Sequence, residues 1–133
     1  MAVPSAKYGS NNQNDFRGLL TVVDQLAIGD ASSVKTATAS SGAATLNSPS
    51  GVVTTESLST AAGSTYTLTL TNSSIAATDI VLLTVGLGTN AAGHPDVVSV
   101  TPAAGSVSVV VKNTHASAAF NGTLTVQFAV IKV

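Results

Sequence analysis

The sequence has no cysteine and no tryptophan, and only 8% of its residues are charged. Without cysteine, the chain shows no sign of the disulfide framework of small secreted domains. Five basic and six acidic residues give a formal charge of −1, with no Lys or Arg cluster to contact phosphates. Aromatic residues make up only 4% of the chain, so platforms for stacking bases are scarce. Nucleic-acid binding is therefore a poor hypothesis.

Long apolar runs are also missing. The longest apolar-rich stretch, residues 19–28, is interrupted by Asp24 and Gln25 and is too short to cross a bilayer. The first nine residues lack the apolar core of a signal peptide. We therefore expect no membrane partner, and we expect synthesis and retention in a cytoplasm. A chain of 133 residues has the size of one domain with a single core.

The few charges divide the chain into two parts. Residues 36–133 carry only five charges, whereas residues 1–35 carry the other six and the polar tract at 11–14. A soluble monomer normally has about 25–35% charged residues on its surface. We therefore predict an N-terminal arm over residues 1–35 and a domain over residues 36–133 whose surface largely faces another protein. The five charges of that domain are Glu56, Asp79, Asp96, Lys112 and Lys132.

The domain alternates apolar and hydroxyl side chains with a period of two. In residues 65–71, Tyr66, Leu68 and Leu70 point to one face of a strand and four threonines to the other. The fold class predicted is all-β: an antiparallel β-sandwich, jelly-roll-like, with an extended N-terminal arm. The alternation also assigns Val107, Val109, Val111, Leu124, Val126, Phe128 and Val130 to the core. We expect strands near residues 43–47, 52–59, 65–72, 79–86, 96–101, 106–113 and 123–132.

The arm holds the candidate partner-binding residues. Phe16 and Arg17 are residue types that anchor interfaces, and Tyr8 and Leu19 add further apolar contact area. The alternative is that Phe16 folds back onto its own domain. Residues 19–28 read equally well as a short helix or as a strand supplied to the sandwich.

No constellation of residues points to chemistry. His94 and Asp96 share a loop and His115 lies in another, but a metal site usually needs three or four ligands. No GxSxG or SxxK motif activates a nucleophile. We expect no catalytic residues, no metal and no cofactor, and we expect alanine at His94, Asp96 or His115 to leave folding and assembly nearly unchanged.

A repeated feature links two strand ends. Asn72 and Asn113 each end a predicted strand and precede an Ala-rich loop. An asparagine at such a position caps the turn with its side-chain amide, because it bonds to the backbone two residues on. This predicts a structural role for both residues.

Residues 51–55, 60–73, 78–83, 97–100, 103–109, 113–116 and 124–130 resemble the small β-sandwich or jelly-roll proteins that decorate the capsids of tailed bacteriophages. The resemblance covers about residues 43–132 and not the arm. It implies a homotrimer that binds the major capsid protein on the virion surface and cements neighbouring capsid subunits. It brings no catalytic residues.

Two other functions stay open at this point. One is a tail-fibre or receptor-binding module of a phage, which has the same strand pattern. The more distant one is a sugar-binding sandwich, which the absence of tryptophan disfavours. For a trimer, we expect subunit contacts on the strand faces that carry Thr67, Thr69, Ser106 and Ser108.

Overall fold

A computed structural model describes residues 35–133 of the chain. Within that range the secondary structure is entirely β, with eight strands and no helix. The alternating segments predicted from the sequence all form strands. The strands are β1 (Thr36–Thr38), β2 (Ala43–Thr45), β3 (Ser50–Thr54), β4 (Thr65–Thr71), β5 (Ile80–Leu87), β6 (Pro95–Ala103), β7 (Ser106–Asn113) and β8 (Leu124–Ile131).

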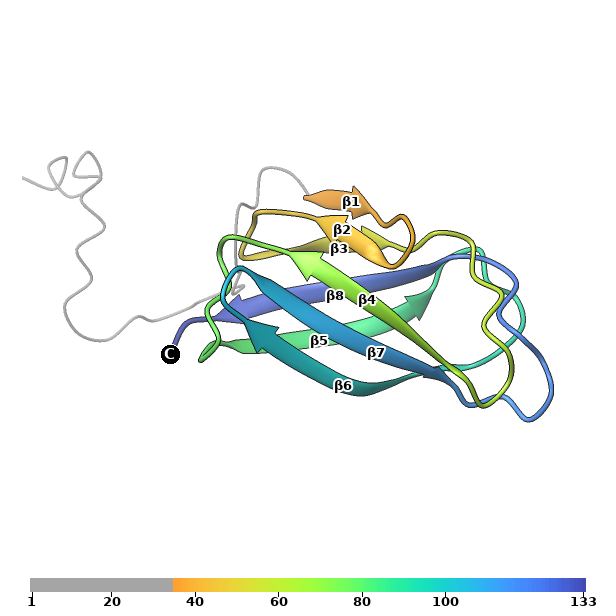
Figure 1. The fold of residues 1–133 in the computed structure, drawn as a ribbon. Coiled ribbons are helices and arrows are strands. Elements are labelled where there is room, and N and C mark those ends of the chain that lie inside the picture. Colours follow the sequence, from red (N-terminus) through yellow and green to blue (C-terminus); the bar gives the residue numbers. More distant parts are fainter. Residues whose placement is uncertain (1–34) are drawn as a thin grey trace, which may run out of the picture.

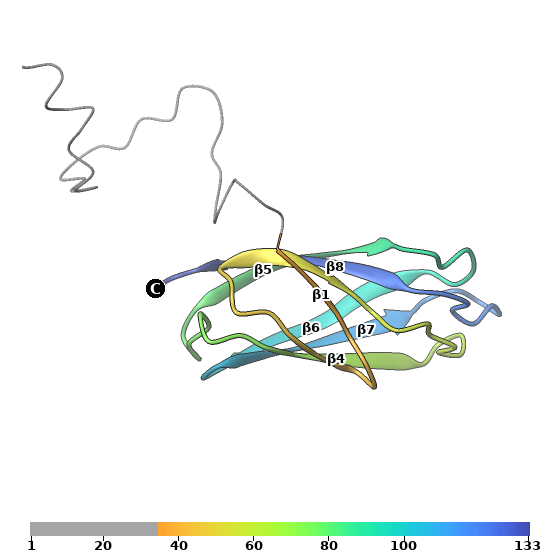
Figure 2. The ribbon, with the colours of Figure 1, turned by 90° about the horizontal axis from the view of Figure 1, so that it is seen from above.

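The strands form two four-stranded sheets packed face to face (Figures 1 and 2). Sheet A has the order β1-β3-β8-β5, and sheet B has the order β2-β4-β7-β6. Figure 2 shows the sheets nearly edge-on, with β5 and β8 in one layer and β4 and β7 in the other. The β-sandwich predicted from the sequence is confirmed.

The expected antiparallel arrangement is corrected at one side of the sandwich. Strands β3 to β8 pair antiparallel, but β1 pairs parallel with β3 and β2 pairs parallel with β4. The chain reverses direction after β1 and again after β2, crossing between the sheets each time. After two reversals β3 runs in the same direction as β1, so these two strands pair parallel. Each sheet therefore contains one parallel pair among antiparallel pairs.

The core lies between the sheets and consists of the residues that alternation places inward. Leu68 and Leu70 are buried, as are the predicted inward residues of β7 and β8. Tyr66 is only partly buried and packs against this core. The threonines of β4 are exposed on the opposite face. The period of two therefore positions the interior correctly.

The strand prediction needs correction in two places. The expected strand over residues 52–59 ends at Thr54, because the next residues leave sheet A and cross toward sheet B. Thr55 is buried at this crossing, where its Oγ1 accepts a hydrogen bond from the backbone N–H of Leu124 at 2.8 Å. Strand β1 is absent from the prediction, because three residues are too few to show a period.

Candidate functional site

An exposed apolar cluster lies on the outer face of sheet A, where β5 and β8 pair. Ile80 is 49% exposed, Leu82 is 54% exposed and Ile131 is 38% exposed. Ile80 lies opposite Ile131 in the register, and Leu82 lies opposite Ala129. Side chains opposite each other on one face of a sheet are in contact distance. We call these four residues the apolar patch.

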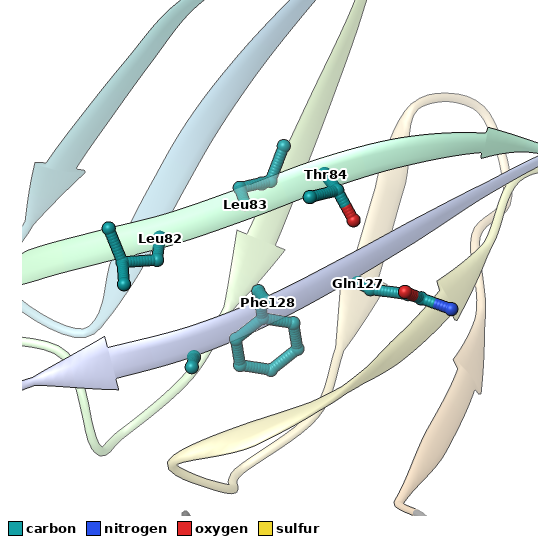
Figure 3. A pocket seen from close by; sticks show the side chains of 6 residues that line it. Leu82, Leu83, Thr84, Gln127 and Phe128 are labelled. Atoms are coloured by element: carbon teal, nitrogen blue, oxygen red, sulfur yellow. The ribbon is translucent and has the colours of Figure 1, made fainter.

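A shallow depression adjoins the apolar patch (Figure 3). Its volume is about 220 Å³, and it is open to solvent. Small-molecule sites typically enclose about 300–1,000 Å³ and surround their ligand. The depression is therefore suited to receive a side chain from a protein partner rather than to enclose a small ligand. Neighbouring parts of β5 and β8 line it through Leu82, Leu83, Thr84, Gln127, Phe128 and Ala129.

The outer face of sheet A carries no charged strand residue. Alternation with the buried positions places hydroxyl, amide and aliphatic side chains there. Asp79 directly precedes Ile80, Lys132 directly follows Ile131, and the two charges pair with each other. A face of this kind meets another uncharged surface without desolvating a charge. Its residues are Thr36, Thr38, Ser50, Val52, Thr54, Ile80, Leu82, Thr84, Thr125, Gln127, Ala129 and Ile131.

Covering the apolar patch would release a useful amount of free energy. Full burial of a Leu or Ile side chain contributes about 1.5–3 kcal/mol, so covering the exposed part of each large side chain adds about 1 kcal/mol. A few such residues at the centre of an interface carry much of its affinity. The patch is thus chemically suited to association with protein.

The outer face of sheet B is different. Of the residues predicted for subunit contacts, Thr69 and Ser108 lie opposite each other, whereas Thr67 lies opposite Val110 and Ser106 opposite Thr71. One end of this hydroxyl face is charged, because Asp96 is the register partner of Lys112. The hydroxyls are compatible with solvent as well as with a partner. In the same sheet, Val98 at the register shift of β6 is 56% exposed, so sheet B also presents apolar surface.

The histidines meet at one end of the sandwich. The rings of His94 and His115 lie edge to face with their centroids 4.9 Å apart. Nδ1 of His115 accepts hydrogen bonds from the backbone N–H groups of Ser117 at 3.1 Å and Ala118 at 2.8 Å. His115 is therefore part of the loop's internal structure, and its replacement by alanine should affect folding more than the sequence suggests. Among residues 35–133, no group of three or more potential metal ligands comes together.

Asn113 organises the same end of the molecule. Its side chain is fully buried, and its Oδ1 accepts from the backbone N–H groups of His94 at 3.0 Å and His115 at 3.1 Å. Its Nδ2 donates to the carbonyl oxygens of Thr60 at 3.1 Å and Ala118 at 2.8 Å. This one amide joins three loops.

Asn72, directly after β4, makes the same bond to the N–H two residues on as Asn113 does: its Oδ1 accepts from the N–H of Ser74 at 2.9 Å. Its Nδ2 donates to the carbonyl oxygen of Ser48 at 2.7 Å, and the residue is fully buried. The capping role predicted for both asparagines is confirmed.

The predicted partner-binding residues Tyr8, Phe16, Arg17 and Leu19 lie outside the described residues, as does the rest of segment 19–28. The apolar patch was missed at the sequence level. Its signal was the run Ile80-Val81-Leu82-Leu83, in which four consecutive large apolar residues replace the apolar and hydroxyl alternation of β4.

Comparisons with protein-family models, with curated proteins and with solved structures find no match for this chain. Within residues 35–133, no helix has the length and apolar character needed to cross a membrane.

Proposed function

We propose that this protein is a structural virion protein. It binds the outside of a bacteriophage capsid as a homotrimer and cements neighbouring copies of the major capsid protein. The observation that carries the proposal is the surface of the sandwich: sheet A presents an uncharged outer face with an exposed apolar patch. The resemblance of about residues 43–132 to capsid decoration proteins supplies the type of partner.

The mechanism is mechanical. A protein that binds the assembled lattice, but not free capsid subunits, lowers the free energy of the lattice by mass action. Three linked copies bind with avidity, so that each single contact can be weak. Residues 1–35 provide the attachment in this scheme, with Tyr8, Phe16, Arg17 and Leu19 as the anchoring side chains.

The first test is the number and position of copies in a purified virion, measured by quantitative mass spectrometry and by antibody labelling in electron microscopy. We expect hundreds of copies on the head. A few copies at the tail would instead identify the tail-fibre or receptor-binding module. Absence from the particle would overturn both.

The second test is co-sedimentation with shells that lack the protein. We expect residues 35–133 alone to stay folded by circular dichroism and to sediment with shells much less than the full chain. In the full chain, Phe16→Ala and Arg17→Ala should each weaken binding. Thr78→Ala, at an exposed position between β4 and β5 and outside the predicted contacts, is the control and should bind normally. A truncated domain that stays folded and binds as well as the full chain would contradict the role of the arm.

A further inference from the structure

The chain enters sheet A at the end that carries the apolar patch. Thr36, Val52, Gln127 and Thr84 are successive register partners and form one row across the sheet. The carbonyl oxygen of Lys35 accepts a hydrogen bond from the N–H of Val52 at 2.9 Å, so the backbone still follows β3 at Lys35. Traced backwards from Thr38, β1 runs toward the rows of Leu82 and Ile80. The segment before Lys35 therefore starts close to the patch.

The distance from this starting point to the patch is short. Strands β1 and β5 are the two outer strands of sheet A, with β3 and β8 between them. Neighbouring strands lie about 4.8 Å apart, so three spacings place β5 about 14 Å from β1. Residues 29–34 span up to about 20 Å when extended. Residues 19–28 can therefore reach the patch of their own chain.

Residues 19–28 have a composition that matches the patch. Six of these ten residues are large and apolar, and Asp24 is the only charged one. Removing such side chains from water is favourable. The patch offers exposed Ile and Leu side chains, and the open depression beside Leu82 can receive one further apolar side chain (Figure 3). The six apolar residues are Leu19, Leu20, Val22, Val23, Leu26 and Ile28.

We propose that residues 19–28 cover the apolar patch of their own chain. The tether selects this occupant over a separate partner, because a short linker makes the contact intramolecular. Short linkers give effective concentrations on the order of millimolar when they can span the two sites. The entry of the chain beside the patch and the reach of residues 29–34 meet that condition. A contact within one chain is compatible with any number of copies in the assembly.

This assignment divides the arm and the uncharged face of sheet A between two tasks. Residues 1–18, which include Phe16 and Arg17, stay available for the shell, whereas Leu19 contacts the sandwich. The hydroxyl end of the face, at Thr38 and Thr54, also stays uncovered. The assignment does not rest on the capsid-binding function, which co-sedimentation of the full chain with shells tests separately.

The test is a disulfide trap in the full chain, which has no cysteine of its own. Val23→Cys in the segment is combined with Leu82→Cys on the patch. The matched control combines Val23→Cys with Leu87→Cys, because Leu87 lies on the same strand, is 57% exposed and is outside the patch. Disulfide formation under a mild oxidant is followed by non-reducing electrophoresis and peptide mass spectrometry. We expect the pair with Leu82 to form at least tenfold faster than the pair with Leu87.

A second series replaces Val23→Cys by Val22→Cys, because adjacent side chains point in different directions. Circular dichroism checks the folding of every variant. If Leu82→Cys does not fold, Thr84→Cys, at an exposed position that lines the depression, takes its place with the same expectation. Equal rates for the patch and control pairs in both series overturn the proposal.

An equal mixture of isotope-labelled and unlabelled chains shows which chain supplies the segment. We expect every cross-linked peptide pair to carry the label on both peptides or on neither. Cross-links that join a labelled to an unlabelled peptide mean that the segment covers the patch of another copy, and they also overturn the proposal.

Discussion

The hydroxyl of Tyr66 donates a hydrogen bond to Oε2 of Glu56 at 3.0 Å. The other oxygen, Oε1, accepts from the backbone N–H of Gly42 at 2.8 Å. Gly42 lies in the turn between β1 and β2 with a φ of 76°, and a Cβ there would meet the carbonyl oxygen of Thr67 at 2.8 Å. One carboxylate thus fastens this turn to strand β4, where a residue with a side chain does not fit.

The first prediction concerns the ionisation of Tyr66. Burial, and then the hydrogen bond to Glu56 and its charge, raise the pKa of Tyr66 above the ordinary value of 10.0. We expect Glu56→Gln to lower this pKa while leaving it above 10.0, because burial is the largest cause and remains. Absorbance titration in a Tyr8→Phe background isolates Tyr66, since the chain has two tyrosines. An unchanged titration curve would contradict the role of Glu56.

The same shift sets a stability trend at high pH. A raised pKa means that the folded state disfavours the ionised form of Tyr66. The protonated phenol therefore makes its full contribution to the free energy of unfolding below the unfolded pKa of 10.0, and this contribution declines as the pH rises above that value. We expect the urea midpoint to fall above about pH 10. The decline should be smaller in Tyr66→Phe, which has no phenol to ionise.

The second prediction concerns the buried amide of Asn113. We expect Asn113→Ala to reduce the free energy of unfolding by about 3 kcal/mol or more, because it leaves buried backbone groups of three loops without partners. Asn121→Ala is the control: its Oδ1 accepts from the N–H groups of Ala91 and Ala92, but the residue is exposed. Water can replace those bonds, so the loss should be about 1 kcal/mol or less. Urea unfolding measures both, and equal losses would contradict the reasoning.

These features differ in how far the sequence predicts them. The faces of β4, β7 and β8 follow from residues two apart, so alternation alone identifies Leu68, Val109 and Val126 as core. The asparagine caps are equally local, since Asn113 bonds to the N–H two residues on. Two further bonds of that amide reach 19 and 53 residues away, to His94 and Thr60, and no local pattern encodes them.

Strand β1 and the apolar patch could not be predicted from neighbouring residues in the sequence, for two different reasons. The position of β1 depends on its parallel pairing with Val52 to Thr54, which only the two chain reversals establish. In the run Ile80-Val81-Leu82-Leu83, both faces are apolar, so the pattern does not tell which side meets the core. Packing decides it: Val81 and Leu83 contact the core, and Ile80 and Leu82 remain exposed.

The third prediction separates the two histidines. We expect His115→Ala to lower the free energy of unfolding by about 1 kcal/mol, because two loop N–H groups lose their acceptor. His94→Ala removes only a ring contact and should stay within about 0.5 kcal/mol. His115→Asn should recover part of the loss, since an asparagine oxygen can accept from the N–H two residues on. Equal effects of both alanine variants in thermal unfolding would contradict the assignment.

The last prediction concerns Asp79, whose side chain is 1% exposed and pairs with Lys132. The hydrogen bond from Lys132, followed by that from the backbone N–H of Ala76, lowers the pKa of Asp79 below the ordinary value of 3.8. Lys132 also donates to the carbonyl oxygen of Ser74 at 2.8 Å, so it connects the end of β8 to the segment between β4 and β5.

Because the pKa of Asp79 is lower in the folded state, its carboxylate makes its full contribution to the free energy of unfolding above pH 3.8. This contribution is lost as the pH falls through the pKa of the folded state. We expect Lys132→Met to raise the pKa of Asp79 in a carboxyl NMR titration and to move acid unfolding to higher pH. Lys112→Met removes the same charge from β7, far along the sequence from this pair, and is the control that should leave Asp79 unchanged. If both variants shift the titration of Asp79 equally, the long-range charge of the protein, and not the contact with Lys132, sets that pKa.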